Sequence, residues 1–154
     1  LRRIDKGGTA DECIATAAKL REAGILHSVM VLLGIGGTAR SREHAAATGR
    51  VLSRMDPPYV GALTTTVVPG TPLAQAQARG EFTLPGKFAL LQELRDIVAG
   101  CELTACRFSA NHASNYLPLR ADLPTDKGPL LAMLDQVLQA RDERLLKPEA
   151  LRGL

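Results

Sequence analysis

Hydrophobic and polar positions follow two different periods along this chain, and they predict an ordered series of helices and strands. Residues 9–23 carry apolar side chains at helical spacing, and the segment opens with a capping-box sequence from Thr9 to Glu12. Gly24 follows as the expected helix stop. A continuous apolar run from about His27 to Leu33 is typical of a buried parallel strand.

The same two periods recur in the rest of the chain. The further predicted elements are a helix opening near Ser41 and ended by Pro57-Pro58, a strand from Tyr59 to Val68, a short helix from Thr71-Pro72 to Gly80, a helix from about Gly86 to Ala99, a weaker strand from Leu103 to Phe108, and a helix from Lys127 to Ala140. Residues 109–124 read as an irregular loop between the last two.

The alternation of helix and strand predicts an α/β fold with a parallel sheet. Such a sheet is covered on both faces or closed into a barrel, and three strands are too few for either. We therefore expect part of a larger barrel or open sheet. The chain begins with Leu1 and runs almost directly into helical pattern, which leads us to expect an excised fragment.

Composition narrows the class of protein. With 154 residues, 45% of them hydrophobic, the chain can bury one core. It has 19 basic and 16 acidic residues, only 3% aromatics and scattered arginines, which disfavours nucleic-acid binding. No run of about 20 apolar residues is present to cross a membrane. The three cysteines form no paired set and lack secretory context, so we expect a cytoplasmic location.

Ligands of parallel α/β sheets lie beyond the carboxyl ends of the strands. This points to residues 34–38, 67–71 and 109–116, which should share one rim. The glycines of the first segment would let the backbone approach a ligand closely. Alternatively they serve the turn alone, since their spacing matches neither the dinucleotide-binding motif nor the phosphate-loop motif. The Pro69-Gly70 corner is equally explained by a type II turn.

Polar side chains in two places suggest contacts to a substrate. Thr64, Thr65 and Thr66 carry hydroxyls in an otherwise apolar strand, where they need hydrogen-bond partners that a polar ligand could supply. The loop from Ser109 to Leu119 is rich in Asn, His and Tyr, which offer directional donors and acceptors. The alternative is that its Asn side chains brace the loop and its His caps a helix.

The chain alone shows no complete catalytic set. It has no His-x-x-x-His or Cys-x-x-Cys pair, so metal binding by this chain is not expected. Cys101 and Cys106 could ligate a cluster, but buried inert thiols are the commoner fate. The carboxylates sit on helical faces beside Lys or Arg, as on solvated surfaces. We therefore expect this polypeptide to be inactive by itself.

Several stretches resemble the C-terminal half of the core of radical S-adenosylmethionine (radical SAM) enzymes. They are Leu1-Arg2-Arg3-Ile4-Asp5-Lys6-Gly7, residues 20–25, Ser28 to Thr38 with its Gly34-Ile35-Gly36-Gly37-Thr38 turn, and Val68-Pro69-Gly70-Thr71-Pro72-Leu73. Within that superfamily the chain resembles the branch of oxygen-independent coproporphyrinogen oxidase-like proteins and Fe-S oxidoreductases. Residues 109–119 and 151–154 are similar to an uncharacterised subgroup.

The resemblance implies a fold and a chemistry. The family core is an open three-quarter (β/α)6 barrel, in which a C-x3-C-x2-C loop binds a 4Fe-4S cluster that chelates S-adenosyl-L-methionine. Reductive cleavage yields a 5'-deoxyadenosyl radical that abstracts hydrogen from the substrate. This chain would supply half of a TIM-like barrel in residues 1–100, with parallel strands, and a family-specific C-terminal helical extension packed on it in residues 101–154.

The resemblance also assigns roles to residues. S-adenosylmethionine would lie against Leu33, Gly34, Ile35, Gly36, Gly37, Val67, Val68 and Pro69. The substrate would meet Thr64, Thr66, Asn111, His112, Asn115 and Tyr116 at the barrel mouth. The cluster-binding cysteines are absent, and Thr38 stands where the family usually has glutamate, so the parent protein would hold the cofactors and this fragment none.

The expected partner is the missing N-terminal half of the barrel. A half-barrel leaves sheet edges and an apolar interior uncovered, so we expect the fragment alone to form a homo-oligomer, with no membrane partner. A second hypothesis is a non-catalytic α/β binding or scaffold module, which a C-x3-C-x2-C loop upstream of Leu1 would exclude. A third, another barrel enzyme, lacks a strand-end lysine or phosphate loop here.

Overall fold

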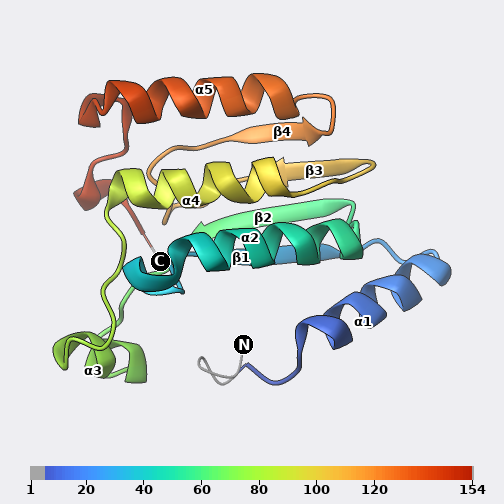
Figure 1. Cartoon of the computed structure of the whole chain (residues 1–154), viewed down its shortest axis with the longest axis horizontal. Helices are drawn as coiled ribbons and strands as arrows, with labels where there is room; N and C mark the ends of the chain where they lie inside the picture. The colour runs from blue at the N-terminus through green and yellow to red at the C-terminus, as the bar shows by residue number, and fades with distance from the viewer. Residues whose placement is uncertain (1–5, 154) are drawn as a thin grey trace.

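The computed structural model describes residues 6–153; the stretch from Leu1 to Asp5 that contributes to the family resemblance lies outside this range, as does Leu154. The elements in chain order are α1 (Ala10–Glu22), β1 (Ser28–Leu33), α2 (Gly37–Met55), β2 (Tyr59–Thr64), α3 (Pro72–Ala78), α4 (Lys87–Gly100), β3 (Cys106–Ser109), β4 (Arg120–Leu123), α5 (Lys127–Ala140) and the 3-10 turns η2 (Glu143–Leu145) and η3 (Glu149–Leu151) (Figure 1).

The strands form one open sheet in the order β1-β2-β3-β4. β1 pairs with β2 and β2 with β3 in parallel, whereas β4 runs antiparallel to β3. The predicted α/β class with a mainly parallel sheet is therefore confirmed. α1 and α5 also begin and end within one residue of the predicted bounds, and the capping box of α1 is formed, with Glu12 N–H donating to Thr9 Oγ1.

The sequence interpretation missed one strand and misplaced one end of each of three elements by several residues. β3 begins at Cys106 instead of Leu103, because residues 103–105 do not pair with β2. The expected loop at 109–124 contains β4, a four-residue strand whose two charged side chains hid its alternation, and its pairing with β3 stabilises it. β2 ends at Thr64 instead of Val68, because Thr65 already leaves the strand while its N–H still donates to Leu33 O at 2.9 Å. α2 begins at Gly37, directly after the glycine turn, instead of near Ser41.

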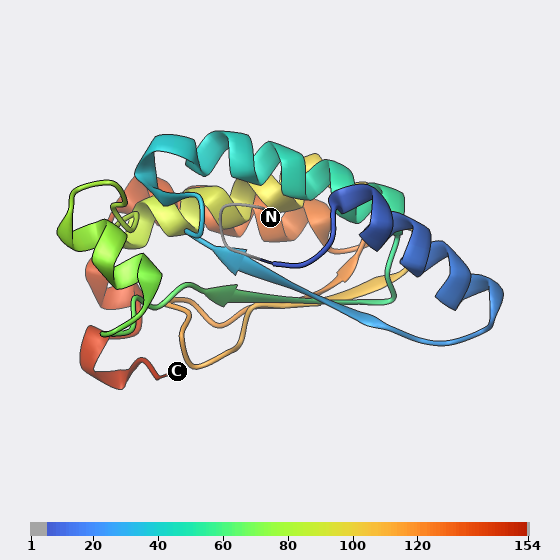
Figure 2. The same ribbon diagram turned by 90° about the horizontal axis from the view of Figure 1, so that it is seen from below.

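Helices α2, α4 and α5 lie side by side on one face of the sheet (Figure 2), which we call the covered face. Every second strand residue points into this layer, and the buried strand side chains are Val31, Leu33, Val60, Ala62, Thr64, Cys106, Phe108, Ala121 and Leu123. α4 is the central helix and packs on both neighbours. A Cβ on Gly49 would lie 2.9 Å from the backbone carbonyl of Gly100, so glycine allows the close contact of α2 with α4.

On the opposite side of the sheet, the open face, residues 6–153 form no helix layer (Figure 2). Its apolar members lie on the first two strands: Met30 is 62% exposed and Leu32 and Tyr59 are each 41% exposed. Its members on β3 and β4 include Arg107 and Asp122, whose charged atoms lie 3.6 Å apart. The open face is therefore apolar over β1 and β2 and charged over β3 and β4.

Residues 101–153 continue the same sheet and the same core as the residues before them. β3 extends the parallel part of the sheet, and Phe108 belongs to one buried cluster with Val60 of β2 and Leu94 of α4. The extension predicted from residue 101 onward therefore shares its core with the first hundred residues.

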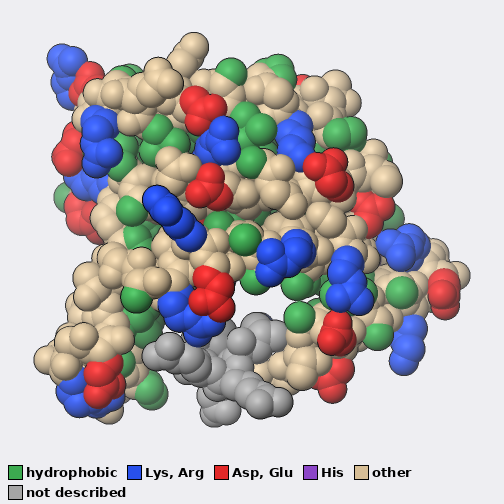
Figure 3. Space-filling view, viewed as in Figure 1, with side chains coloured by type: hydrophobic (Ala, Val, Ile, Leu, Met, Phe, Trp, Pro, Cys, Tyr) green, Lys and Arg blue, Asp and Glu red, His purple; other side chains and the backbone are tan. Residues whose placement is uncertain are grey.

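The surface of the helix layer carries charges of both signs, interspersed (Figure 3). Ion pairs join Arg40 to Glu43, Arg79 to Glu81 and Arg95 to Asp135. These pairs are exposed or half-exposed, and screening by water leaves each with little effect on stability. Within residues 6–153, no helix is both long and apolar enough to cross a bilayer.

Candidate ligand-binding rim

The carboxyl ends of β1, β2 and β3 meet at one edge of the sheet because the three strands are parallel. Thr65 N–H bonds to Leu33 O at 2.9 Å, and Thr64 N–H bonds to Ser114 Oγ at 3.1 Å. The glycine turn after β1, the start of the segment after β2 and the loop after β3 therefore lie together. We call this edge the rim.

The glycine turn is explained in part by backbone conformation and packing. Gly34 and Gly37 have φ values of +81° and +66°. A Cβ on Gly34 would lie 2.7 Å from Leu90 Cδ2, and one on Gly37 would lie 3.2 Å from the Phe82 ring. These two glycines are thus required by the turn and by contacts within the protein, which is the alternative that the sequence left open.

A buried carboxylate lies directly behind this turn and corrects the expectation that the helical carboxylates are solvated. Glu93 of α4 is only 1% exposed. Its Oε1 accepts the N–H of Gly34 at 2.7 Å and lies 2.9 Å from His44 Nδ1, and its Oε2 accepts the hydroxyl of Ser41. Glu93 lies on the apolar stripe of its helix, between Leu90 and Ile97, which was a signal in the sequence.

The hydrogen bonds keep Glu93 ionised. Burial alone would raise the pKa of the Glu93 carboxyl, but the hydrogen bonds from His44, Ser41 and the Gly34 N–H outweigh it, and the pKa lies below its usual value. A fixed negative charge therefore stands behind the glycine turn.

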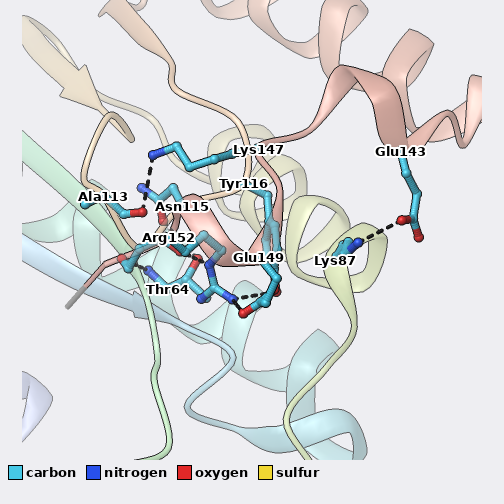
Figure 4. Close-up of polar contacts among 10 residues, drawn as sticks. Thr64, Lys87, Ala113, Asn115, Tyr116, Glu143, Lys147, Glu149 and Arg152 are labelled. Carbon is cyan, nitrogen blue, oxygen red and sulfur yellow. Dashed lines mark hydrogen bonds and ion pairs between the residues drawn. The ribbon is translucent and has the colours of Figure 1, made fainter.

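Thr64 and Asn115, two of the predicted substrate residues, contact each other (Figure 4). Asn115 donates from Nδ2 to the carbonyls of Ala62 at 2.7 Å and Ala110 at 2.8 Å, and its Oδ1 accepts the hydroxyl of Thr64 at 2.9 Å. Both side chains are buried. Their polar groups are occupied within the protein, and they attach the loop after β3 to the end of β2.

Tyr116 is held by the segment 147–153, which we call the C-terminal strap (Figure 4). Arg152 donates from Nη1 to the Tyr116 hydroxyl at 2.5 Å and from Nε to Ser114 O at 2.7 Å, and its guanidinium carbon lies 4.1 Å from the Tyr116 ring centre. The Tyr116 hydroxyl donates to Glu149 at 2.7 Å. Burial, followed by the contact with Glu149, raises the pKa of Tyr116 to about 12.

Asn111 and His112 differ from these residues because they face accessible space. Both line a hollow of about 340 Å³ on the open face, together with Met30, Tyr59 and Arg107. His112 Nδ1 lies 2.9 Å from Ser114 Oγ. With its amide oxygen toward Arg120, Asn111 accepts from Nη2 at 2.7 Å. Thr66 is exposed and lies outside this hollow.

The segment after β2 adds apolar surface to the rim. Val67 is half-buried, and Val68 and Pro69 are exposed, as is Thr38 beside the glycine turn. Thr65 is only 6% exposed, and its hydroxyl has no hydrogen-bond partner among residues 6–153. A buried hydroxyl without a partner costs about 1–3 kcal/mol.

The cysteines are free thiols. Cys101 and Cys106 are buried, and burial raises the pKa of Cys106 to about 11. Cys13 is exposed on α1. In the part of the chain that the structure describes, no group of three or more His, Cys, Asp or Glu side chains is arranged to hold a metal ion.

The fold and the rim define an α/β protein with an open, mainly parallel sheet whose strand ends gather at one edge. No protein-family model matches the chain, and no curated protein matches it. A functional proposal therefore depends on the geometry of the rim and the open face.

Proposed function

We propose that this chain is the C-terminal half of the barrel of a radical S-adenosylmethionine Fe-S oxidoreductase. Two features together support it best: the open face is apolar over β1 and β2, and β1 is an edge strand whose outer side pairs with no other strand among residues 6–153. β1 has six residues, Ser-Val-Met-Val-Leu-Leu, and contains no charged residue and no proline. Natural proteins protect such an edge or pair it with another strand.

The distribution of polarity on the open face supports the same proposal. Met30, Leu32 and Tyr59 are exposed on β1 and β2, whereas Arg107 and Asp122 occupy the far side of the sheet. In a half-barrel the helices lie outside and the open face lines the interior, so the missing strands would continue from β1. The N-terminal half of the barrel is the partner that this arrangement fits.

The rim fits a nucleoside of the S-adenosylmethionine type. No hydrogen bond among residues 6–153 uses the N–H of Ile35 or Gly36, the Thr65 hydroxyl is unpartnered, and Val67 and Val68 offer apolar contact. A flat base needs such backbone donors and apolar surface. Beside a reduced 4Fe-4S cluster held by the other half, S-adenosylmethionine would supply the 5'-deoxyadenosyl radical for hydrogen abstraction from a substrate.

The substrate-facing residues in this proposal are Asn111 and His112, which border the hollow on the open face. Thr64, Asn115 and Tyr116 support them by fixing the loop after β3. This chain contributes nucleoside and substrate contacts, while the cluster comes from the other half, so the isolated fragment is inactive. Its apolar open face would be covered by self-association, which sedimentation at micromolar concentration tests.

The test is anaerobic reconstitution of the full-length protein that carries this chain, followed by reduction and assay for 5'-deoxyadenosine. Cleavage of S-adenosylmethionine is the expected result, and a reconstituted cluster that forms no 5'-deoxyadenosine under strong reductant contradicts the proposal. Thr65→Val is expected to weaken S-adenosylmethionine binding, because it removes the unpartnered hydroxyl. Thr66→Val, at an exposed neighbouring position, is the matched control.

A further inference from the structure

The N-terminus of α2 begins at the glycine turn, and such a terminus ordinarily attracts anions. Aligned peptide dipoles place about half a positive charge there, which is why phosphates are often bound at helix N-termini. α2 has 19 residues, and Gly36 at its N-cap provides no side-chain cap. By this feature alone the turn would favour a phosphate-bearing nucleotide.

Glu93 opposes that electrostatic preference. Its carboxylate contacts the Gly34 N–H at 2.7 Å and is inaccessible to solvent screening, at 1% exposure. A full negative charge there exceeds the half charge of the helix terminus. His44, whose Nδ1 lies 2.9 Å from Glu93 Oε1, is the only basic side chain paired with Glu93 among residues 6–153. Arg40, on the first turn of α2, is already paired with Glu43 at 2.6 Å.

We infer that Glu93 is a specificity-determining positioning residue of the rim, whose buried charge behind the glycine turn selects an uncharged or cationic nucleoside over a phosphorylated one. The inference rests on the proposed function, because it concerns the nucleoside site of that proposal. A sulfonium nucleoside carries a positive charge near the ribose, whereas a nucleotide carries two negative charges on its 5'-phosphate. The two classes therefore experience opposite interactions with Glu93.

Adenosine and adenosine 5'-monophosphate form the matched probe pair, because they differ only in the phosphate. Their dissociation constants for the full-length protein are measured by calorimetry at low ionic strength, for the wild type and for Glu93→Gln. The wild type is expected to bind adenosine more tightly than the monophosphate. The ratio of interest is the dissociation constant of the monophosphate divided by that of adenosine. Glu93→Gln is expected to reduce this ratio about tenfold, the effect of one charge at a separation of roughly 8–10 Å in a medium of intermediate dielectric.

Glu22→Gln is the control, because it removes the same charge from an exposed position at the end of α1, on a different element from the glycine turn. It should leave the ratio unchanged. An unchanged ratio in folded Glu93→Gln overturns the inference. If that variant does not fold, the wild type decides alone, since equal or tighter binding of the monophosphate also overturns it.

The outcomes separate this inference from the proposed function. Cleavage of S-adenosylmethionine together with equal binding of the two probes rejects the role of Glu93 and leaves the radical chemistry standing. A second outcome is that the protein prefers adenosine, that Glu93→Gln reduces this preference, and that the reconstituted protein forms no 5'-deoxyadenosine. This outcome supports the role of Glu93 and rejects the radical chemistry. Binding of neither probe rejects the role of Glu93, and the assay for 5'-deoxyadenosine then decides the radical chemistry separately.

Discussion

The two faces of the sheet are made by alternate residues of the same strands, yet they differ in composition and in packing. On the covered face, Val60 and Phe108 are at most 2% exposed beneath α2, α4 and α5. On the open face, Met30 and Leu32 are similarly apolar but remain 62% and 41% exposed. The helices of residues 6–153 therefore bury one face of the sheet and leave the other exposed.

Apolar composition alone therefore does not distinguish a core strand face from an interaction face. β3 and β4 carry Arg107 and Asp122 on the open side, as expected of a surface in contact with water. β1 and β2 do not. The contrast within a single face locates the surface that another layer of protein would cover.

The largest expected effect is on the covered face. Phe108→Ala removes a fully buried aromatic side chain and should lower the free energy of unfolding by about 3–5 kcal/mol. Met30→Ala on the open face is the matched control and should change it by about 0.5 kcal/mol or less. Urea unfolding followed by circular dichroism measures both, and equal losses would show that the open face is packed in solution.

A smaller loss of stability is expected when Asn115 of the rim is replaced. Asn115→Ala leaves the carbonyls of Ala62 and Ala110 and the hydroxyl of Thr64 without their partner. The expected cost is about 2–3 kcal/mol, because buried polar groups lose their hydrogen bonds. Asn111→Ala, at the border of the hollow, should cost about 0.5 kcal/mol or less in the same measurement. The reverse order would mean that Asn115 does not brace the loop.

The acid stability of the covered side depends on Glu93. Its pKa is lowered in the folded protein relative to the usual 4.5, so its contribution to stability is present above that value and is lost as the pH falls through the lowered pKa. Between pH 6 and pH 3 the wild type should therefore lose more stability than Glu93→Gln. Thermal unfolding across this range measures the difference, and Glu22→Gln on the surface of α1 serves as the control.

The smallest change in stability is expected for a charge placed on the apolar part of the open face. Leu32→Lys should alter the free energy of unfolding of this chain by about 0.5 kcal/mol or less, because its side chain is already 41% exposed. It should nevertheless reduce binding of a hydrophobic dye and weaken self-association. A Leu32→Lys variant that keeps both properties would show that another surface is responsible.

Much of the fold could be predicted from periodicity, because the signals are local. The α5 bounds Lys127–Ala140 followed directly from spaced leucines, and the α1 start followed from Thr9 and Glu12. β4 was missed because four residues, two of them charged, carry almost no pattern, and its formation depends on pairing with β3.

The rim was less predictable, because its contacts join residues far apart in the chain. The location of the three segments followed from parallel strands, but the partners of Asn115 and Tyr116 did not. Thr64 and Asn115 are 51 positions apart, and Arg152 reaches Tyr116 from the C-terminal strap. Polar residues in a loop give the same sequence pattern whether they bind a ligand or one another. Only Glu93 had a readable signal, its place on an apolar helical stripe.

The antiparallel orientation of β4 makes the two edges of the sheet different. A strand–helix repeat adds each new strand parallel to the last, and β4 interrupts that repeat on its own side, since it turns back after β3 through the loop at 110–119. A strand that continued the parallel run of β1, β2 and β3 without interruption would pair with the edge of β1. Under the half-barrel proposal, a barrel completed from β1 would remain open beside β4, because β4 does not continue the parallel order.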